Sequence, residues 1–508
     1  MEAPTERISR GEERFELWRC RAGLPLGLLL AFAVYLVAAG LPPEQRRLAA
    51  VLALVLVFWI TEAIPIPATA LLGPSLCVLA GVAGPQEIYR PFADPIIFVF
   101  IGSFLIAEAM TANGLDRRVA LGILSSRAIS GSPARIRLAV GATSALISMW
   151  MSNTATVAIL FPIVVGVSDA LERLFARGDE EARRIGRSYI TGLMLVTAYA
   201  ASIGGLATPV GTPPNLIGLG MMDQLAGRRI PFFEWMLIGV PVTVVAFIAL
   251  ILIIALVHPA PKRRIEGLES AIQQLRVGIP EWGRAQTYTL IAFLTAVTLW
   301  VLPGAIALAQ GSESPLYRLL GARLHEGVVA LLAASLLFLL PVGWSPPHGA
   351  LRWRQAVNID WGTILLFGGG LSLGGMMIST GLAKRMAEKL LGAGGTADVW
   401  LITVVATLFG VAITETTSNT ASASIVVPMA IAVAKTAGVS PLPPALGATI
   451  GVSLAFMLPV STPPNAIVYG SGRITILQML RAGFLLDAVG YVLLLLLLRL
   501  LCPLLGMA

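Results

Sequence analysis

Charged residues and cysteine are both scarce in this chain of 508 residues. Asp, Glu, Lys and Arg make up 13% of it, whereas 56% of the residues are hydrophobic. A soluble chain carries roughly a quarter charged residues, so an ordinary soluble fold is excluded. Three scattered thiols, Cys20, Cys77 and Cys502, indicate no disulfide framework.

Histidine is equally rare, and the histidines form no metal motif. His258, His325 and His348 have no metal-ligand spacing between them. No nucleophile with a neighbouring base stands out either, so the sequence does not indicate an enzyme. The net charge of +8 comes mostly from Lys and Arg in short loops between hydrophobic runs. There it sets membrane orientation and does not point to nucleic acid.

The hydrophobic residues are gathered in long runs, many of which approach the ~20 residues that cross a bilayer as a helix. We therefore predict an all-α, polytopic membrane protein with about 11 transmembrane helices, plus two re-entrant hairpins. The predicted crossings are 24–40, 48–65, 68–83, 95–112, 189–209, 232–257, 287–306, 327–342, 361–379, 443–460 and 484–505.

The segments between these runs indicate their orientation. Residues 1–22 mix five Glu with five Arg and lack the form of a cleavable signal peptide, so we expect a cytoplasmic helix leading into an uncleaved first span. Two amphipathic segments, 114–127 and 381–392, are expected to lie along the membrane interface. The basic segments expected in the cytoplasm are 117–137, 173–187, 262–284 and 352–354. The absence of any Asn-x-Ser/Thr sequon fits a bacterial inner membrane.

Two hydrophobic segments, 137–171 and 398–436, are each interrupted by the same polar triplet. The triplets are Ser152-Asn153-Thr154 and Ser418-Asn419-Thr420. Both ends of the first segment carry Arg, so both ends are expected to face the cytoplasm. Each segment is therefore predicted to be a re-entrant helical hairpin with its tip at the triplet.

The triplets belong to an internal repeat. "SNTATVAILFP" aligns with "SNTASASIVVP" at an offset of 266 residues, and "GTPPN" at 211–215 matches "STPPN" at 461–465 at an offset of 250. Five predicted crossings separate the triplets, and five is odd, so the second copy should be inverted relative to the first. Inverted repeats with broken helices are an architecture of secondary transporters.

Small polar residues also pack membrane helices closely, and one isolated triplet would be explained in that way. The chain, however, has only six Asn, and four of them, Asn153, Asn215, Asn419 and Asn465, lie in the paired motifs. A hairpin tip exposes carbonyl oxygens that suit a cation and amide groups that suit an anion. The consecutive prolines of the TPPN motifs should break a helix and expose further carbonyls. The paired pattern favours a binding site over packing alone.

At these residues the chain resembles the divalent anion/sodium symporter family, which carries dicarboxylates, citrate or sulfate. The resemblance covers nearly the whole chain and includes "FWITEAIPIPATALL" (58–72) and "SLAFMLPVSTPPNAIVYGSG" (453–472). It implies a homodimer of elevator-type transporters, each with a fixed scaffold and a moving transport domain. The implied divisions are 1–22 (N-terminal helix), 23–136 and 287–397 (scaffold), 137–257 and 398–508 (transport domain), and 258–286 (cytoplasmic linker).

The resemblance also implies site residues. The substrate carboxylates would bind Asn153, Thr154, Asn419, Thr420, Thr462 and Pro463. One sodium site would use Ser148, Ser152, Asn153, Gly204 and Gly205, with the facing glycine left open. The mirror sodium site would use Thr414, Thr417, Asn419 and Ser461. Glu62 is interpreted as structural, whereas Glu415 is left open between a structural and a functional role.

The leading hypothesis is sodium-coupled uptake of a small dianion. Burying an unpaired dianion is very costly, and neither tip carries Lys or Arg within ten residues, so bound cations are the obvious compensation. Two triplet copies suit a four-carbon dicarboxylate such as succinate. The alternatives are a sodium-independent dicarboxylate exchanger, a sulfate or citrate transporter of the same fold, a membrane-embedded enzyme and a channel.

Overall fold

The structure is a computed structural model of the whole chain, and it describes residues 10–124, 132–175, 179–261, 281–311, 313–344, 347–391 and 398–508. Part of the predicted linker and short parts of both amphipathic segments lie outside these residues. Nearly all of the described chain is helical, with one two-stranded antiparallel ribbon in which Gly343 pairs with His348.

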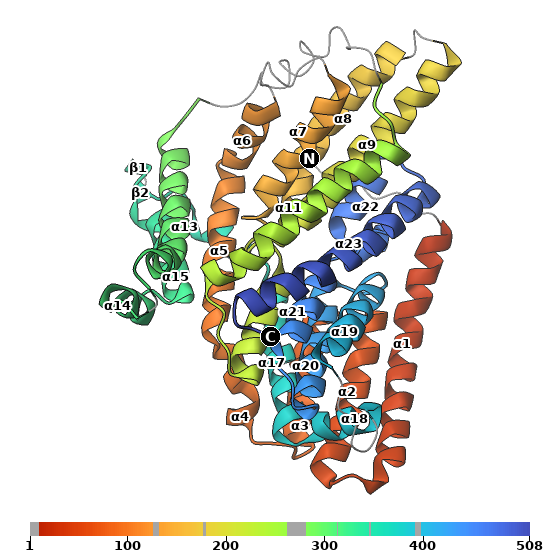
Figure 1. Cartoon of the computed structure of the whole chain (residues 1–508), viewed down its shortest axis with the longest axis vertical. Coiled ribbons are helices and arrows are strands. Elements are labelled where there is room, and N and C mark those ends of the chain that lie inside the picture. The colour runs from red at the N-terminus through yellow and green to blue at the C-terminus, as the bar shows by residue number, and fades with distance from the viewer. Residues whose placement is uncertain are drawn as a thin grey trace.

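The elements follow one another along the chain without any larger sheet (Figure 1). They are α1 (Arg10–Val37), η1 (Ala38–Gly40), α2 (Pro43–Thr61), α3 (Ile66–Leu79), α4 (Pro85–Tyr89), η2 (Arg90–Ala93), α5 (Pro95–Ala112), α6 (Leu115–Leu124), α7 (Pro133–Ser148), α8 (Asn153–Phe175), α9 (Glu180–Gly204), α10 (Pro213–Met221), η3 (Met222–Ala226), α11 (Phe232–Val257), α13 (Arg284–Gln310), α14 (Pro315–Arg323), α15 (Glu326–Leu339), β1 (Gly343–Trp344), β2 (Pro347–His348), α16 (Trp353–Ala356), α17 (Trp361–Ser379), α18 (Leu382–Leu391), α19 (Val399–Thr414), α20 (Asn419–Thr436), α21 (Leu442–Gly451), η4 (Pro459–Ser461), α22 (Pro463–Tyr469) and α23 (Ile476–Leu504).

Seven stretches of the described chain are long and apolar enough to span a membrane, and an eighth is added if α14 and α15 form one bent span. The seven lie in α1, α4–α5, α8, α11, α13, α17 and α23. Each of the eleven predicted crossings contains helix, but several of these helices are short, charged at one end or broken, so the number eleven is not confirmed. Among the long ones is α8, which the sequence predicts as a hairpin limb.

Local chemistry explains where the helices deviate from the predicted segments. The basic segment 173–187 lies between the predicted hydrophobic runs, yet residues 180–187 form the first turns of α9. Asp179 caps this helix by accepting a hydrogen bond from the Ala182 amide at 2.8 Å, which satisfies one of the free amides at a helix start. The predicted interfacial helices are present as α6 and α18. Glu62 ends α2 with a left-handed φ of 50° and pairs with Arg19 at 3.5 Å, a structural role as interpreted from the sequence.

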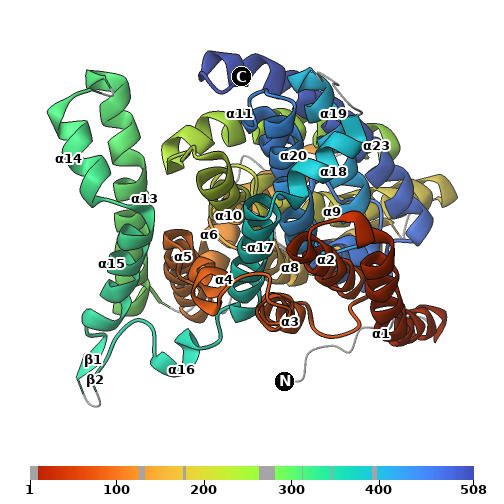
Figure 2. The same ribbon diagram turned by 90° about the horizontal axis from the view of Figure 1, so that it is seen from below.

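The helices of the two repeats form the centre of the molecule. In Figures 1 and 2, α13–α15 lie on one side and α1 on the opposite side, with the hairpin helices between them. The long helix α9 packs on both limbs of the first hairpin, α7 and α8, and α21 packs in the same way on α19 and α20. Nearly every side chain of α9 from Tyr189 to Gly204 is buried, so α9 forms part of the core that holds both breaks.

The short helices beyond the two breaks are exchanged between the repeats. Helix α22 packs on α8 and α9 of the first repeat, while α10 packs on α20 and α21 of the second. Arg473, just after α22, pairs with Asp169 and Glu172 near the end of α8. These ion pairs hold the segment after α22 against the C-terminal part of α8.

Candidate functional site

The first triplet is a break between two helices, as predicted. Helix α7 ends at Ser148 and α8 begins at Asn153. The Ser148 hydroxyl donates to Asn153 Oδ1 at 2.7 Å, and Ser152 Oγ accepts from the Ala155 amide at 3.2 Å. Ser152 thus caps α8, and Asn153 is oriented by the last residue of the preceding helix.

The second triplet repeats this arrangement. Helix α20 begins at Asn419, and the Thr414 hydroxyl lies 2.7 Å from Asn419 Oδ1 and 2.6 Å from the Val452 carbonyl. Thr414 and Asn419 are each 266 residues beyond Ser148 and Asn153, so the two tips use matched positions. The Thr417 hydroxyl is engaged elsewhere in the hairpin, with Ile413 O at 2.9 Å and Ser422 Oγ at 2.6 Å.

The first break distinguishes the two glycines that the sequence leaves open. A Cβ on Gly204 would lie 2.3 Å from the Ala145 carbonyl, so Gly204 is needed for close packing against α7. A Cβ on Gly205 would lie 2.5 Å from Asn153 Oδ1 and 3.1 Å from the Gly211 carbonyl. Gly205 is therefore the glycine that packs against Asn153 of the tip, and it also packs against Gly211.

Gly211 is a residue that the sequence interpretation missed. It stands at the same place in GTPPN as Ser461 in STPPN, so the alignment of the two motifs already carries the signal. A Cβ on Gly211 would lie 2.6 Å from the Gly205 carbonyl. The backbone at Gly205 and Gly211 thus approaches closely, and no larger residue fits at either position.

The second break is held by a carboxylate that has no equivalent in the first. Glu415 lies three residues before the second triplet. Its Oε1 accepts from the Phe456 amide at 2.9 Å and the Met457 amide at 3.2 Å. Its Oε2 accepts from the Ser461 hydroxyl at 2.7 Å. Thr462 caps α22 by accepting from the Asn465 amide at 3.3 Å. Glu415 thus joins the second tip to the second break.

The predicted substrate residues differ in exposure. Thr154 and Pro463 are exposed, and Asn153, Asn419 and Thr420 are half-buried, whereas Thr462 is buried like Ser148, Thr414 and Ser461 of the cation set. Helices α8, α10, α20 and α22 all begin at the tips or breaks. The starts of α8 and α20 have free amides and positive dipole ends that can attract an anion, whereas the paired prolines leave the first turns of α10 and α22 without these amides. Among the described residues no hydrogen bond joins the two tips.

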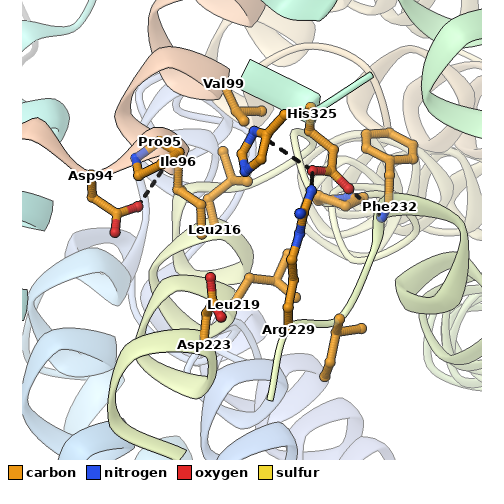
Figure 3. A pocket seen from close by; sticks show the side chains of 13 residues that line it. Asp94, Pro95, Ile96, Val99, Leu216, Leu219, Asp223, Arg229, Phe232 and His325 are labelled. Carbon is orange, nitrogen blue, oxygen red and sulfur yellow. Dashed lines mark hydrogen bonds and ion pairs between the residues drawn. The ribbon is translucent and has the colours of Figure 1, made fainter. Parts of the chain in front are cut away.

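Three cavities lie outside the triplets. The smallest, of about 40 Å³, is beside Pro209 of the first break, and Figure 3 shows its charged lining. There Arg229 pairs with Glu326, and Gln224 donates to Asp94. The others, of about 680 and 320 Å³, lie between α11 and α13–α14 and between α2 and α20. None of the three is lined by Asn153 or Asn419, so their charged groups are separate from the tips.

Known proteins resemble the chain over almost its entire length. The sequence profile described as "Sodium:sulfate symporter transmembrane region" matches residues 20–508. A Staphylococcus saprophyticus protein named sodium-dependent dicarboxylate transporter SdcS is 34% identical over 448 residues, which are 88% of this chain and 84% of that protein. An uncharacterized transporter of Haemophilus influenzae is 33% identical over 462 residues, 91% of this chain and 93% of that protein.

A solved structure supports the fold alone. The Alcanivorax borkumensis YdaH transporter superposes with a TM-score of 0.51 over 96% of this chain and 97% of that chain, at 15% sequence identity. The family profile and the relatives are transporters, which confirms the prediction that the chain is not an enzyme. The chain belongs to the sodium:sulfate symporter family of membrane transporters, the family that its paired triplets and TPPN motifs indicate.

Proposed function

We propose that the protein couples sodium to the symport of a small dianion, a C4-dicarboxylate such as succinate. The observation that carries this proposal is the matched pair of tips, in which the last residue of one helix orients the Asn that begins the next. The relatives named sodium-dependent dicarboxylate transporters support the same cation and substrate class.

The buried oxygen atoms suit sodium, because hard cations prefer hydroxyl, carbonyl and amide oxygen ligands. We assign the first site to Ser148, Ser152, Asn153 and the Gly204–Gly205 backbone, with Gly205 as the facing glycine. The mirror site comprises Thr414, Thr417, Asn419 and Ser461. In both sites the Asn side chain lies between the buried ligands and the more open residue that follows it.

The more open residues suit the dianion. One carboxylate would bind Asn153 and Thr154, and the other Asn419 and Thr420, with Thr462 and Pro463 at the start of α22 completing the site. The amides at the starts of α8 and α20 supply donors, and bound sodium supplies the positive charge that the tips lack. Because each Asn borders both ligands, sodium and substrate would stabilise each other.

The proposed architecture is an inverted repeat of elevator type. Support comes from the exchange of α10 and α22, which joins the two hairpins and the two broken helices into one packed unit. We assign 137–257 and 398–508 to the transport domain, 23–136 and 287–397 to the scaffold, and 258–286 to a cytoplasmic linker. A homodimer in the bacterial inner membrane, with a cytoplasmic N-terminus, completes the proposal.

Uptake of labelled succinate into proteoliposomes tests the function. We expect uptake to require an inward sodium gradient and to be competed by fumarate more strongly than by sulfate or citrate. Equal uptake without sodium, together with counterflow from internal dicarboxylate, would identify a sodium-independent exchanger instead. Stronger competition by sulfate or citrate would identify that anion as the substrate instead.

A further inference from the structure

The last residue of each TPPN motif clamps the break that precedes it. Asn215 and Asn465 are both 0% exposed. The Asn215 side-chain amide donates to the carbonyls of Gly205 at 2.9 Å and Thr208 at 2.8 Å. The Asn465 amide donates to the carbonyls of Ala455 at 3.1 Å and Leu458 at 3.0 Å. Each Asn thus pairs two carbonyls that the broken helix leaves free.

The two Asn residues make equivalent hydrogen bonds at an offset of 250 residues. Within the first, the Gly211 amide donates to Thr208 O at 3.4 Å, and within the second the Ser461 amide donates to Leu458 O at 3.3 Å. The clamped turn therefore ends at Gly211 in one copy and at Ser461 in the other. Gly211 lies close to Gly205 beside the first triplet, and Ser461 contacts Glu415 beside the second triplet.

Each clamp uses the donors of the amide and leaves its acceptor unused. Asn215 Oδ1 and Asn465 Oδ1 are buried and have no hydrogen-bond partner among the described residues. A buried unpaired acceptor is unfavourable, so a nonpolar side chain of similar size would be preferred if the position only had to be filled. The presence of Asn at both matched positions indicates that the two donated hydrogen bonds are required.

We propose that Asn215 and Asn465 are positioning residues for the two sodium sites, each fixing its break in the conformation that presents cation ligands to the neighbouring tip. This inference rests on the proposed sodium sites around Gly205 and Ser461. Without the clamp the break samples other conformations. The apparent affinity for sodium then falls in proportion to the fraction of protein in the competent conformation.

The test compares the full-length wild type with Asn215→Ala, Asn465→Ala, Asn215→Leu and Asn465→Leu. Sodium is titrated in detergent, with the thermal unfolding midpoint as a measure of binding, and in proteoliposomes, with succinate uptake as the readout. We expect each Ala variant to raise the half-saturating sodium concentration roughly tenfold, as for a competent fraction of about a tenth. Maximal uptake at saturating sodium should change much less. The Leu variants should be no better than Ala, because Leu restores volume without donors.

Asn113→Ala is the matched control. The Asn113 amide also donates to several oxygens, but these lie in α5 (Ala109 O at 2.9 Å), in α13 (Thr289 Oγ1 at 3.0 Å) and before α16 (Ala350 O at 2.9 Å), and neither break supplies any of them. Its loss should lower the unfolding midpoint and leave half-saturating sodium unchanged. The proposal is overturned if the Asn215 and Asn465 variants behave like this control, or if Leu restores sodium affinity. A wild type that does not respond to sodium in either assay overturns the proposed function as well, which distinguishes the two failures.

Discussion

The Ser461 hydroxyl donates to Glu415 Oε2 at 2.7 Å and lies 2.9 Å from the Glu415 carbonyl, so the second break is fastened to the second tip by one residue on each side. The first repeat has Met149 at the position of Glu415, and there the Thr208 hydroxyl of the first break donates to the Met149 backbone carbonyl instead of a carboxylate. The two halves therefore share a shape but hold it by different contacts.

Glu415→Gln should weaken sodium binding while the protein still folds. The amide retains one acceptor oxygen for the Phe456 and Met457 amides, but its NH2 group cannot accept from Ser461. A hydrogen bond to a charged group contributes about 1.5–3 kcal/mol, so half-saturating sodium should rise roughly tenfold or more. Sodium-dependent succinate uptake measures this, with the exposed Glu87→Gln as a control. Unchanged sodium dependence would show that Glu415 does not support the cation site.

Asp487→Asn should be tolerated. Asp487 is buried, and its Oδ2 lies 3.4 Å from the Phe456 amide, which also donates to Glu415. Asparagine at 487 keeps an oxygen that can accept from this amide. Uptake by Asp487→Asn should stay near the wild-type rate, whereas Asp487→Leu, which has no acceptor, should lose most of it.

The parts of the site that recur in the sequence could be predicted from it. The Asn residues of the triplets begin α8 and α20 because a polar residue between two hydrophobic limbs caps a new helix more readily than it continues the old one. The TPPN prolines begin α10 and α22 because proline fits the first turn of a helix and removes no needed amide there.

The contacts between distant segments could not be predicted. Glu415 and Ser461 are 46 residues apart, and no periodicity links them. The exchange of α10 and α22 between the repeats also depends on packing that a linear pattern does not express. The start of α9 was missed for a different reason, since its charged first turns are typical of a loop until the Asp179 cap is known.

His258 should make the protein less stable in mild acid. It follows α11, and burial lowers the pKa of its imidazole below the usual 6.5, with the Arg137 charge acting in the same direction against a hydrogen bond to Ser188. The His258 imidazole thus binds a proton less readily in the folded protein than in the unfolded chain. Stability is full above about pH 6.5 and falls as the pH drops below it. The thermal midpoint should decline less steeply for His258→Gln than for the wild type between roughly pH 7 and 5, and parallel curves would contradict the assignment.

The final prediction concerns the two triplet asparagines as a pair. Asn153→Ala removes the acceptor of the Ser148 hydroxyl, and Asn419→Ala removes one of the two acceptors within reach of the Thr414 hydroxyl. Each change also removes a ligand shared by the proposed sodium and substrate sites. The loss of a hydrogen-bonding partner in a buried site costs about 1–3 kcal/mol, so each variant should lose roughly tenfold or more in affinity. Because one residue serves both ligands, the affinities for sodium and for succinate should weaken together, as reciprocal coupling requires.

The exposed Asn358 provides the neutral control for this pair, and Asn358→Ala should transport near normally. Asn113, also outside the motifs, is unsuitable for that purpose because its side chain joins the end of α5 to α13 and to Ala350 before α16. Succinate uptake is measured in proteoliposomes with equal protein load, as a function of the succinate and sodium concentrations. Loss of succinate affinity with unchanged sodium dependence would place the asparagines at the anion alone. Wild-type affinity for both ligands would remove them from the site, and the matched 2.7 Å contacts would then be helix caps that only stabilise the hairpins.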